Sequence, residues 1–359
     1  MQLDLPLVFA VLMGLAMLAY VILDGFDLGV GILLPLASRA EHDMMVSSIG
    51  PFWDANETWL VLGVGILLVA FPKAHGIILT SLYLPVAAML VFLVLRGVSF
   101  EFRVKATGWH RELWNRLFFV GSLGAAVAQG FMLGGVVSGF APGPAHVLFG
   151  LVVGVGLAGG YALLGATWLV VKSEGDLQMR ALRWSRGALL FTVAGVAAIS
   201  LATPFASTRV FDRWFAWPNV ALLAPLPFAT AAAFAGIWIA VGRLQRLRTR
   251  REWIPFVLAV CVFVFAFAGL AYSLFPYLIV DRMTIWQAAA ARNSLSFVFV
   301  GTSVVLPVIV IYTVFAYRVF WGKTRELTYG QSFHHEPETI GYQHGGPVSV
   351  QNVAERTYP

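Results

Sequence analysis

One long uncharged segment constrains the fold of this chain more than any other feature. No Asp, Glu, Lys or Arg occurs between Leu117 and Val171, and a membrane-spanning helix needs only about 20 apolar residues. The Ala-Pro-Gly-Pro sequence at 141–144 is typical of a turn. Because irregular backbone is not tolerated in contact with lipid, the segment predicts two apolar helices joined by a tight hairpin.

The composition agrees with a membrane protein and excludes several other classes. Hydrophobic residues make up 59% of the 359 positions and charged residues only 12%, whereas soluble domains carry about 25% charged residues. An ordinary soluble enzyme, a disordered chain and a secreted disulfide scaffold are therefore excluded. The single Cys261 excludes an intrachain disulfide and a cysteine-ligated zinc or iron–sulfur site.

Apolar stretches separated by Gly, Pro or charged residues predict nine membrane-spanning helices in an all-α integral membrane protein. We expect them at residues 6–36, 52–72, 76–98, 117–139, 145–171, 187–206, 219–242, 254–276 and 294–318. We expect the first helix to be retained, because Met1-Gln2-Leu3-Asp4 lacks the basic segment of a signal peptide. The sequence contains no nucleotide-binding motif, so nothing indicates an ATP-driven function.

The basic residues predict the orientation of the chain in the membrane. Nineteen of the 24 Lys and Arg residues lie in alternate loops or in the tail, and hence on one side. The five others are Lys73, Arg209, Arg213, Arg282 and Arg292. Cytoplasmic loops carry the excess of Lys and Arg, so we expect the N-terminus outside and the C-terminus in the cytoplasm. The net charge of +6 therefore requires no nucleic-acid partner.

Residues 321–359 predict a polar cytoplasmic tail. Their apolar residues are too few to form a core of their own. The tail contains His334, His335 and His344. A metal site formed by these histidines is one alternative, but a polar tail with a few histidines more often binds no metal.

Acidic residues within the first predicted helix are the strongest candidates for a functional site. An Asp at the centre of a bilayer costs ~2.5 kcal/mol or more. Asp24 and Asp27 are three residues apart, which places both carboxyl groups on one face of the helix. Gly25, Gly29 and Gly31 keep that helix thin, so that a neighbouring helix can approach closely.

The next two predicted helices carry further polar candidates. The second begins with Trp53, Asp54 and Glu57, and the third ends near Arg96 and Glu101. Neighbouring buried carboxyl groups titrate as a coupled set, and an arginine keeps some of them ionised. We interpret the three helices as a proton inlet from the cytoplasm. Two alternatives stay open: Asp54 and Glu57 as acids favoured at a helix N-terminus, and Arg96 extended toward the lipid headgroups.

Residues that could bind haem are missing from the middle of the predicted helices. None of the seven histidines lies there, and an intramembrane haem needs axial His, Met or Cys at depth. Isolated methionines on apolar helices usually fill packing space; those within helices are Met13, Met17, Met89 and Met132. We therefore expect this chain to bind no haem and no metal, and a partner to carry any redox centre.

Three motifs give the chain a resemblance to a known family. They are Asp24-Gly-Phe-Asp27, Phe52-Trp53-Asp54-Ala-Asn56-Glu57-Thr-Trp59 and Arg96-Gly-Val-Ser-Phe-Glu101. Their order and positions resemble subunit II of the cytochrome bd-type quinol oxidases, over about residues 5–325. The Asn-Glu-Thr-Trp form at 56–59 differs from the Asn-Gln-Val-Trp form of better-known members, and it is more similar to the cyanide-insensitive branch.

The resemblance implies a fold of two four-helix bundles and one peripheral helix. The first bundle, at 1–140, would carry the acidic residues, and the second would occupy 141–280. The ninth helix would follow at 281–320, before the tail at 321–359. The implied location is the bacterial cytoplasmic (inner) membrane, which the chain would cross several times.

The same resemblance implies the function, partners and cofactors. A haem-bearing subunit I would hold haem b together with haem d, or with haem b in place of haem d, and would oxidise quinol and reduce oxygen. Subunit II would lead cytoplasmic protons toward that site. Small single-helix accessory subunits, membrane lipid and a structural quinone are further implied components. The residues matching the inlet are Asp54, Asp27, Glu57, Glu101 and Asp24 for proton transfer, with Arg96 and Trp53 in support.

Two other classes of function compete with an oxidase subunit. A proton-coupled secondary transporter also uses intramembrane acids, but it predicts inverted repeats, broken helices and a site at the midplane. A structural scaffold predicts that the carboxyl groups are dispensable. The acidic residues lie toward one side of the membrane, which disfavours transport, and the three motifs favour the oxidase.

Overall fold

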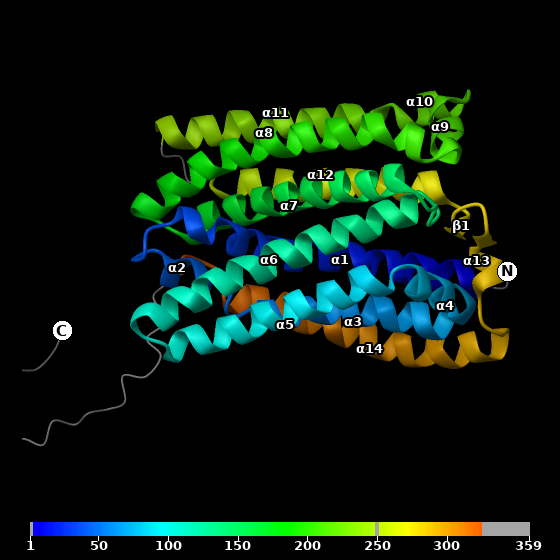
Figure 1. Ribbon diagram of the computed structural model, residues 1–359, viewed down its shortest axis with the longest axis horizontal. Helices are drawn as coiled ribbons and strands as arrows, with labels where there is room; N and C mark the ends of the chain where they lie inside the picture. The colour runs from blue at the N-terminus through cyan, green and yellow to red at the C-terminus, as the bar shows by residue number, and fades with distance from the viewer. Residues whose placement is uncertain (1–2, 248–250, 325–359) are drawn as a thin grey trace, which may run out of the picture. The chain divides into compact units, whose positions relative to one another are not determined.

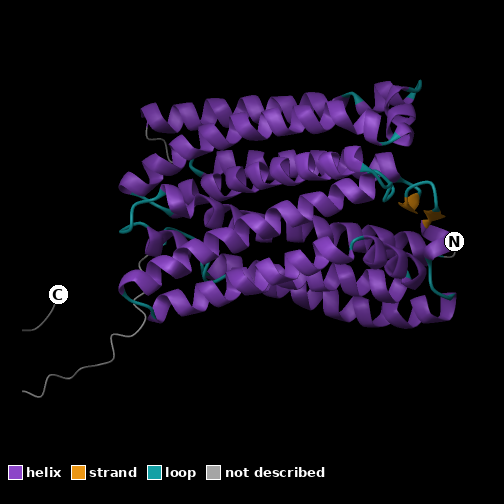
Figure 2. Cartoon of the chain, in the orientation of Figure 1, coloured by secondary structure: helices purple, strands orange, loops and turns teal. Residues whose placement is uncertain are grey.

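The computed structural model describes residues 3–247 and 251–324 (Figures 1 and 2). Within these residues, nine helices are long and apolar enough to cross a membrane. They run side by side along the long axis of the molecule (Figure 1). The prediction of nine spanning helices in an all-α protein is therefore confirmed.

The spanning helices follow one another with short connections. They are α1 (Leu5–Leu33, continued by the 3-10 helix η1, Leu34–Leu36), α3 (Trp53–Ala70), α5 (Tyr83–Lys105), α6 (Gly108–Val137), α7 (Pro144–Lys172), α8 (Gly175–Ala206), α10 (Asn219–Leu223) with α11 (Pro225–Leu247), α12 (Trp253–Leu274) and α14 (Arg292–Val319). The short helices are α2 (His42–Ser47), α4 (Pro72–Ser81), α9 (Thr208–Phe215) and α13 (Ile285–Ala288). Strands β1 (Tyr277–Ile279) and β2 (Met283–Thr284) form a small antiparallel pair.

Several helices extend beyond their predicted bounds. Helix α6 begins at Gly108 instead of 117, and α8 begins at Gly175 instead of 187. Their first turns carry charged residues that hydropathy excludes from a bilayer, yet a helix can continue past the membrane surface. The third span begins at Tyr83 rather than 76, because the preceding residues form the separate helix α4. The hairpin predicted at 141–144 is confirmed between α6 and α7.

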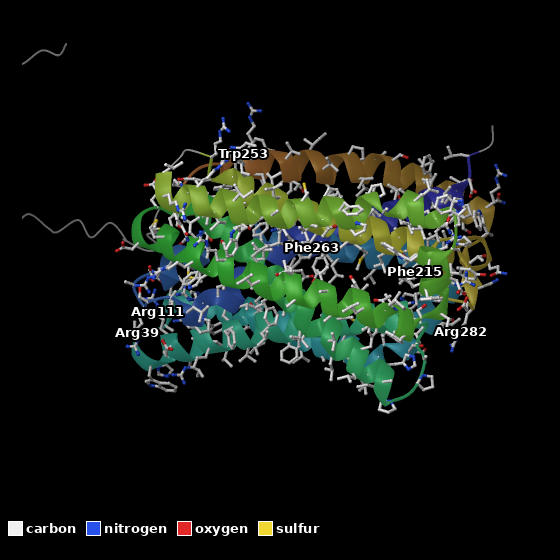
Figure 3. All side chains as sticks on the ribbon, turned by 90° about the horizontal axis from the view of Figure 1, so that it is seen from above. Arg39, Arg111, Phe215, Trp253, Phe263 and Arg282 are labelled. Atoms are coloured by element: carbon white, nitrogen blue, oxygen red, sulfur yellow. The ribbon has the colours of Figure 1, made fainter. Side chains whose placement is uncertain are left out.

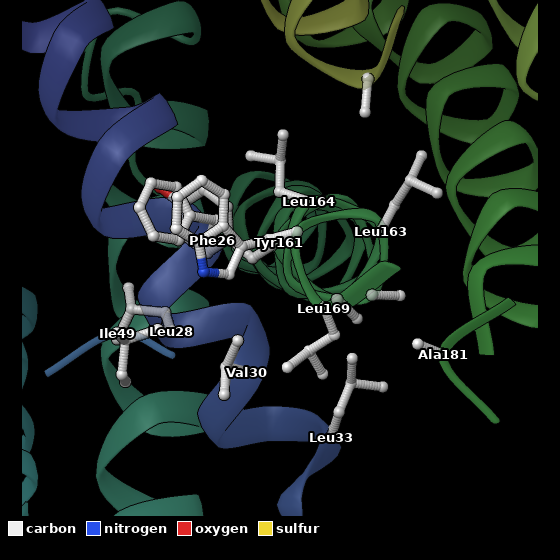
Figure 4. Close-up of a cluster of buried hydrophobic side chains, with 14 of the residues drawn as sticks. Phe26, Leu28, Val30, Leu33, Ile49, Tyr161, Leu163, Leu164, Leu169 and Ala181 are labelled. Atoms are coloured by element: carbon white, nitrogen blue, oxygen red, sulfur yellow. The ribbon is translucent and has the colours of Figure 1, made fainter. Parts of the chain in front are cut away.

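Helix α7 occupies the centre of the molecule, in contact with α1, α6, α8 and α12. Its approach to α1 depends on glycine: a Cβ atom at Gly29 would lie 1.8 Å from the carbonyl oxygen of Tyr161, and one at Gly165 would lie 2.3 Å from the backbone of Gly29. Phe26 and Trp168 stack beside this contact with ring centroids 4.3 Å apart. Figure 4 shows Phe26 beside Tyr161 at this junction. The predicted close approach at the glycines of the first helix is confirmed.

Helices α7 and α14 end beside each other and are linked by two lysines. The Lys172 ammonium group donates to the carbonyl of Phe320 at 2.6 Å, and Lys323 donates to the carbonyl of Ser173 at 2.9 Å. Each lysine therefore satisfies a carbonyl near the C-terminal end of the other helix, where backbone acceptors lack partners within the helix. Elsewhere α14 is little buried and packs mainly on α1 and α3.

Basic residues gather at one end of the molecule, where the end of α5 and the start of α6 carry Arg103, Lys105, Arg111 and Arg116. Figure 3 places Arg39 and Arg111 at one end and Arg282 at the other. We call the first the basic end; it contains α2 and the connections from α5 to α6 and from α7 to α8.

A polar network holds α2 at the basic end. The Asn115 amide donates to Nδ1 of the buried His42 at 3.0 Å, and its oxygen accepts from Arg103 at 2.9 Å. Arg103 and Arg111 both pair with Asp43. Burial, with the positive charge of Arg103 nearby, lowers the pKa of His42 below its ordinary 6.5. The folded protein therefore holds this imidazole in its neutral form.

The glycine contact gives the first prediction. Changing Gly29 to Ala should lower stability by about 1–3 kcal/mol, because the added methyl group meets the α7 backbone. Gly187→Ala is the matched control: Gly187 lies in α8, a Cβ atom there would meet open space with nothing within 4 Å, and alanine favours a helix over glycine. In thermal unfolding in detergent, the midpoint of Gly29→Ala should be lower than that of the wild type, whereas the midpoint of Gly187→Ala should not be lower. Equal midpoints would contradict the packing argument.

The second prediction concerns pH and His42. The unfolded chain takes up a proton near pH 6.5, whereas folded His42 does so only at lower pH, so stability should fall as the pH falls below about 6.5. His42→Gln removes this titration. The unfolding midpoint of the wild type should therefore decrease more than that of His42→Gln on acidification. Parallel curves for the two proteins would show that His42 does not contribute to the pH dependence.

Candidate functional site

The first, second and third spanning helices bring four charged or ionisable side chains together inside the protein. Asp24 and Asp27 come from α1, Glu57 from α3 and Arg96 from α5. We call these four residues the acidic cluster. Asp24 and Asp27 are fully buried, Arg96 is 1% exposed, and the Glu57 side chain is 29% exposed. Within the cluster, therefore, only the Glu57 side chain on α3 reaches the surface of this chain.

Arg96 is held between two carboxylates. Its Nη1 atom donates to Oδ1 of Asp24 at 2.6 Å, and its Nη2 atom donates to Oε1 of Glu57 at 2.5 Å. The guanidinium carbon lies 5.9 Å from the ring centre of Trp53. Gly121 of α6 lies against the Arg96 backbone, where a Cβ would come within 2.8 Å. Arg96 thus points inward, and the alternative of an arginine extended to the headgroups is wrong.

Asp27 has a different kind of partner. The Asn56 amide donates to its Oδ2 atom at 2.8 Å and also to the carbonyl of Leu23 at 3.2 Å. The oxygen of the same amide accepts from the Tyr317 hydroxyl at 3.0 Å. Oδ1 of Asp27 is buried and has no hydrogen-bond partner among the described residues. Asp27 is therefore bound to a neutral group, while Asp24 is bound to the arginine.

A second polar group lies next to the cluster, among α1, α6 and α7. The Tyr161 hydroxyl donates to Oε1 of Gln129 at 2.6 Å, and Nε2 of Gln129 donates to the Tyr20 hydroxyl at 2.8 Å. We call these three residues the Tyr–Gln–Tyr chain. Tyr20 lies one helical turn before Asp24 on the same face of α1.

Sequence analysis missed the Tyr–Gln–Tyr chain and the Asn56–Tyr317 contact. Gln129 is the only amide side chain in the long uncharged segment, so it could have been recognised as a polar group at membrane depth. Tyr20, Tyr161 and Tyr317 give no such signal, because tyrosine is common in apolar helices and near membrane surfaces.

The structure brings together only some of the predicted site residues. Asp24, Asp27, Glu57 and Arg96 meet, and Trp53 packs at 5.0 Å from the Phe100 ring beside them. Asp54 and Glu101 instead lie on the exposed surfaces of α3 and α5. Asp54 precedes Glu57 by one turn of α3, on the side where the cluster opens.

No group of three or more His, Cys, Asp or Glu in residues 3–247 and 251–324 is arranged to hold a metal ion. The histidines of these ranges lie outside the middle of the spans: His42 in α2, His75 in α4, and His110 and His146 in the first turns of α6 and α7. His334, His335 and His344 fall outside the described residues. That this chain binds no haem stays a prediction.

Comparison with known proteins gives one consistent result. The family model "Cytochrome bd terminal oxidase subunit II" matches residues 5–320. Cytochrome bd-I ubiquinol oxidase subunit 2 of Escherichia coli K12 is 24% identical, with 89% of this chain and 95% of the relative covered. Cytochrome bd ubiquinol oxidase subunit 2 of Bacillus subtilis is 25% identical, with 86% and 94% covered.

A solved structure shares the fold. A chain of the bd oxidase from Geobacillus thermodenitrificans superposes with a TM-score of 0.73 at 17% identity, with 89% of this chain and 99% of that chain covered. At 17% identity, this similarity shows that the two chains share a fold.

The buried ion pairs give the third prediction. Arg96→Gln leaves the buried Asp24 carboxylate without its cation, which should cost about 3–5 kcal/mol. Arg116→Gln is the control: its side chain is 75% exposed and pairs with Glu112, so the change should cost about 1 kcal/mol or less. Adding Asp24→Asn to Arg96→Gln should restore part of the loss. Thermal unfolding of the wild type, the two arginine variants and the double variant measures these stability changes. Equal losses of stability in Arg96→Gln and Arg116→Gln would contradict the prediction.

Proposed function

This chain belongs to the family of cytochrome bd terminal oxidase subunit II, and we propose that it conducts protons from the cytoplasm toward the oxygen-reduction site. As a member of that family, it is a multi-pass membrane subunit of an oxidoreductase complex of the respiratory chain. The proposal includes quinol and oxygen as substrates of the complex. It also includes haems, b-type and d-type or b-type alone, in a partner subunit I. This chain would contribute no haem ligand.

The observation that carries the proposal is the ratio of charges in the acidic cluster. Three carboxyl groups share one guanidinium group, within a region from which water is largely excluded. Arg96 binds two of them, and Asp27 has only the neutral Asn56 amide. Buried carboxyl groups that cannot all be paired with cations exchange protons as a coupled set. A cluster of this kind can store and release a proton within the membrane.

The exposure of the carboxyl groups supports a direction for the path. Asp54 is exposed, Glu57 is partly buried one turn further along α3, and Asp24 and Asp27 are fully buried. The exposure of these carboxyl groups therefore decreases from the protein surface to its interior. Glu101, exposed near the end of α5, would collect protons at the basic end. Four protons are consumed for each oxygen molecule reduced to water, and they cannot cross an apolar layer without such groups.

The orientation of the chain is part of the proposal. The excess of Lys and Arg at the basic end supports a cytoplasmic position for that end and for the C-terminus, with the N-terminus outside. The acidic cluster lies in the half of α1 nearer the basic end. Protons would therefore enter from the cytoplasm.

Helix contacts support the division into two bundles with a peripheral helix. In the first group α1 contacts α3 and α6, and α5 contacts α6; in the second, α7 contacts α8 and α12, and α11 contacts α8 and α12. Helix α7 also contacts α1 and α6 and so joins the two groups, and α14 packs on α1 and α3. The four parts would be residues 1–140, 141–280, 281–320 and the tail.

The partner subunit would cover the side of the cluster that is open in this chain. A carboxylate is costly in contact with lipid, and Asp54 is exposed on α3. Beside it, α14 presents a row of exposed apolar side chains. We propose that subunit I packs on this face, and that lipid and single-helix accessory subunits cover other apolar faces.

An apolar groove of about 570 Å³ lies between Leu62 of α3 and the first half of α14. It suits an acyl or isoprenoid chain. Its only side-chain polar group is the Thr302 hydroxyl, so these residues supply little to hold a quinone headgroup. The structural quinone and the cyanide-insensitive branch therefore stay predictions from the motifs.

The fourth prediction tests proton conduction in the assembled oxidase. Asp27→Asn and Asp54→Asn remove a titratable proton and keep nearly the same shape, so each complex should retain its haem and lose about 100-fold in turnover. Oxygen consumption per haem, measured across pH in the same preparation, separates catalysis from assembly. Asp212→Asn, at the opposite end of the molecule, is the control and should leave turnover unchanged.

Each variant has a clear contrary result. Wild-type turnover with full haem in Asp54→Asn would leave Asp54 as an acid favoured at a helix N-terminus. The same result in Asp27→Asn would remove the acidic cluster from the proton path.

A further inference from the structure

Asn56 is a fully buried residue in the first turn of α3, and its side-chain amide bonds to two other helices. Its Nδ2 atom donates to Oδ2 of Asp27 at 2.8 Å and to the carbonyl of Leu23 at 3.2 Å, both in α1. Its Oδ1 atom accepts from the Tyr317 hydroxyl of α14 at 3.0 Å. The amide therefore has one favoured orientation, because turning it over would place its oxygen against two acceptors.

Tyr317 supplies the donor that the Asn56 oxygen needs. Asn56 lies inside the protein, where an amide oxygen without a hydrogen bond is costly. The hydroxyl reaches it from the last turn of α14, 261 residues further along the chain. The last spanning helix of the described chain thus completes a bond that begins at the first.

The ring of Tyr317 is held separately from its hydroxyl. It stacks on Phe52, with ring centroids 4.5 Å apart and an interplanar angle of 23°. Phe52 directly precedes α3, so the stack aligns the last turn of α14 with the first turn of α3. The Lys172 ammonium group lies 5.2 Å from the centre of the Phe52 ring and donates to the carbonyl of Phe320. Ring stacking and this lysine therefore fix where the Tyr317 hydroxyl lies.

The Asn56 amide in turn determines how Asp27 is presented. It holds one carboxyl oxygen, Oδ2, and so sets the direction of the other, Oδ1. Oδ1 is buried and has no hydrogen-bond partner within residues 3–247 and 251–324. It is therefore the oxygen of Asp27 that is available to a proton donor or acceptor.

We propose that Tyr317 is a positioning residue of the proton path, which acts by fixing the Asn56 amide that holds Asp27. Asn56 is the second positioning residue, because it alone contacts both Tyr317 and Asp27 through hydrogen bonds. The inference rests on the proposed conduction of protons through Asp27. It gives the peripheral helix α14 a part in that conduction, through a side chain that itself transfers no proton.

Oxygen consumption per haem in the purified oxidase complex tests the inference. Tyr317→Phe removes the hydroxyl and keeps the ring that stacks on Phe52, so the complex should assemble with full haem. Maximal turnover should fall about 10-fold, because a displaced carboxyl group transfers protons less well. The KM for quinol should stay unchanged, because quinol would bind to the partner subunit.

A second variant separates positioning from a general loss of structure. Asn56→Leu is similar in size and makes neither bond, so it should lower turnover about 10-fold or more. Because Tyr317 acts through Asn56, adding Tyr317→Phe to Asn56→Leu should cause no further loss. Thermal unfolding measures the same coupling without turnover: Tyr317→Phe should lower the unfolding midpoint of the wild type, but not that of Asn56→Leu.

Tyr272→Phe is the matched control. The Tyr272 hydroxyl also donates to an asparagine, Asn219 at the start of α10, and the distance is again 3.0 Å. This pair lies at the end of the molecule opposite the basic end (Figure 1). Tyr272→Phe should therefore have the turnover and KM of the wild type.

Three outcomes would overturn the inference: wild-type turnover in Tyr317→Phe, a Tyr317→Phe complex without haem, and an equal further loss when Tyr317→Phe is added to Asn56→Leu. Failure of the proposed function looks different. Asp27→Asn would then keep full turnover, while Tyr317→Phe and Asn56→Leu would still be coupled in thermal unfolding.

Discussion

The position of Arg96 between Asp24 and Glu57 is the interaction on which the site depends. It joins α1, α3 and α5 inside an apolar protein, where an unpaired charge would be far more costly than at a surface. Because one guanidinium group serves two carboxylates, the third carboxyl group, Asp27, must find a neutral partner. Asn56 supplies it. The unequal partners of the two aspartates on α1 thus follow from the presence of a single buried cation.

The glycine contact between α1 and α7 sets the geometry of this arrangement. At Gly29 and Gly165 the two backbones touch, so α1 lies deep between its neighbours and turns Asp24 and Asp27 away from lipid. The same approach brings Tyr161 of α7 within reach of Gln129 and, through it, Tyr20. The glycine contact between the two helices is therefore what allows the hydrogen bonds among their polar side chains. Where the backbones meet, the polar side chains of three helices can also meet.

Much of the architecture could be predicted because it depends on local properties of the chain. Hydropathy located the nine spans and the hairpin at 141–144, and the three-residue spacing of Asp24 and Asp27 placed them on one face. Helix ends outside the bilayer were missed, since hydropathy measures only the part in lipid. The partners of these acids could not be predicted. Tyr317 lies far along the chain from Asn56, and Asp54 and Glu57, although three residues apart, differ in burial because only Glu57 reaches Arg96.

The position of Tyr317 near the end of α14 has a consequence for biosynthesis. The acids of α1 and α3 enter the membrane early, but the hydroxyl that completes the Asn56 contact belongs to the last spanning helix of the described chain. Lys172 and Lys323 secure that helix only after its final turn has been translated. Until then Asn56 lacks one of its partners. A ribosome must therefore finish nearly the whole membrane domain before the surroundings of Asp27 are complete, and a chain truncated before α14 would contain every acid of the cluster without its final geometry.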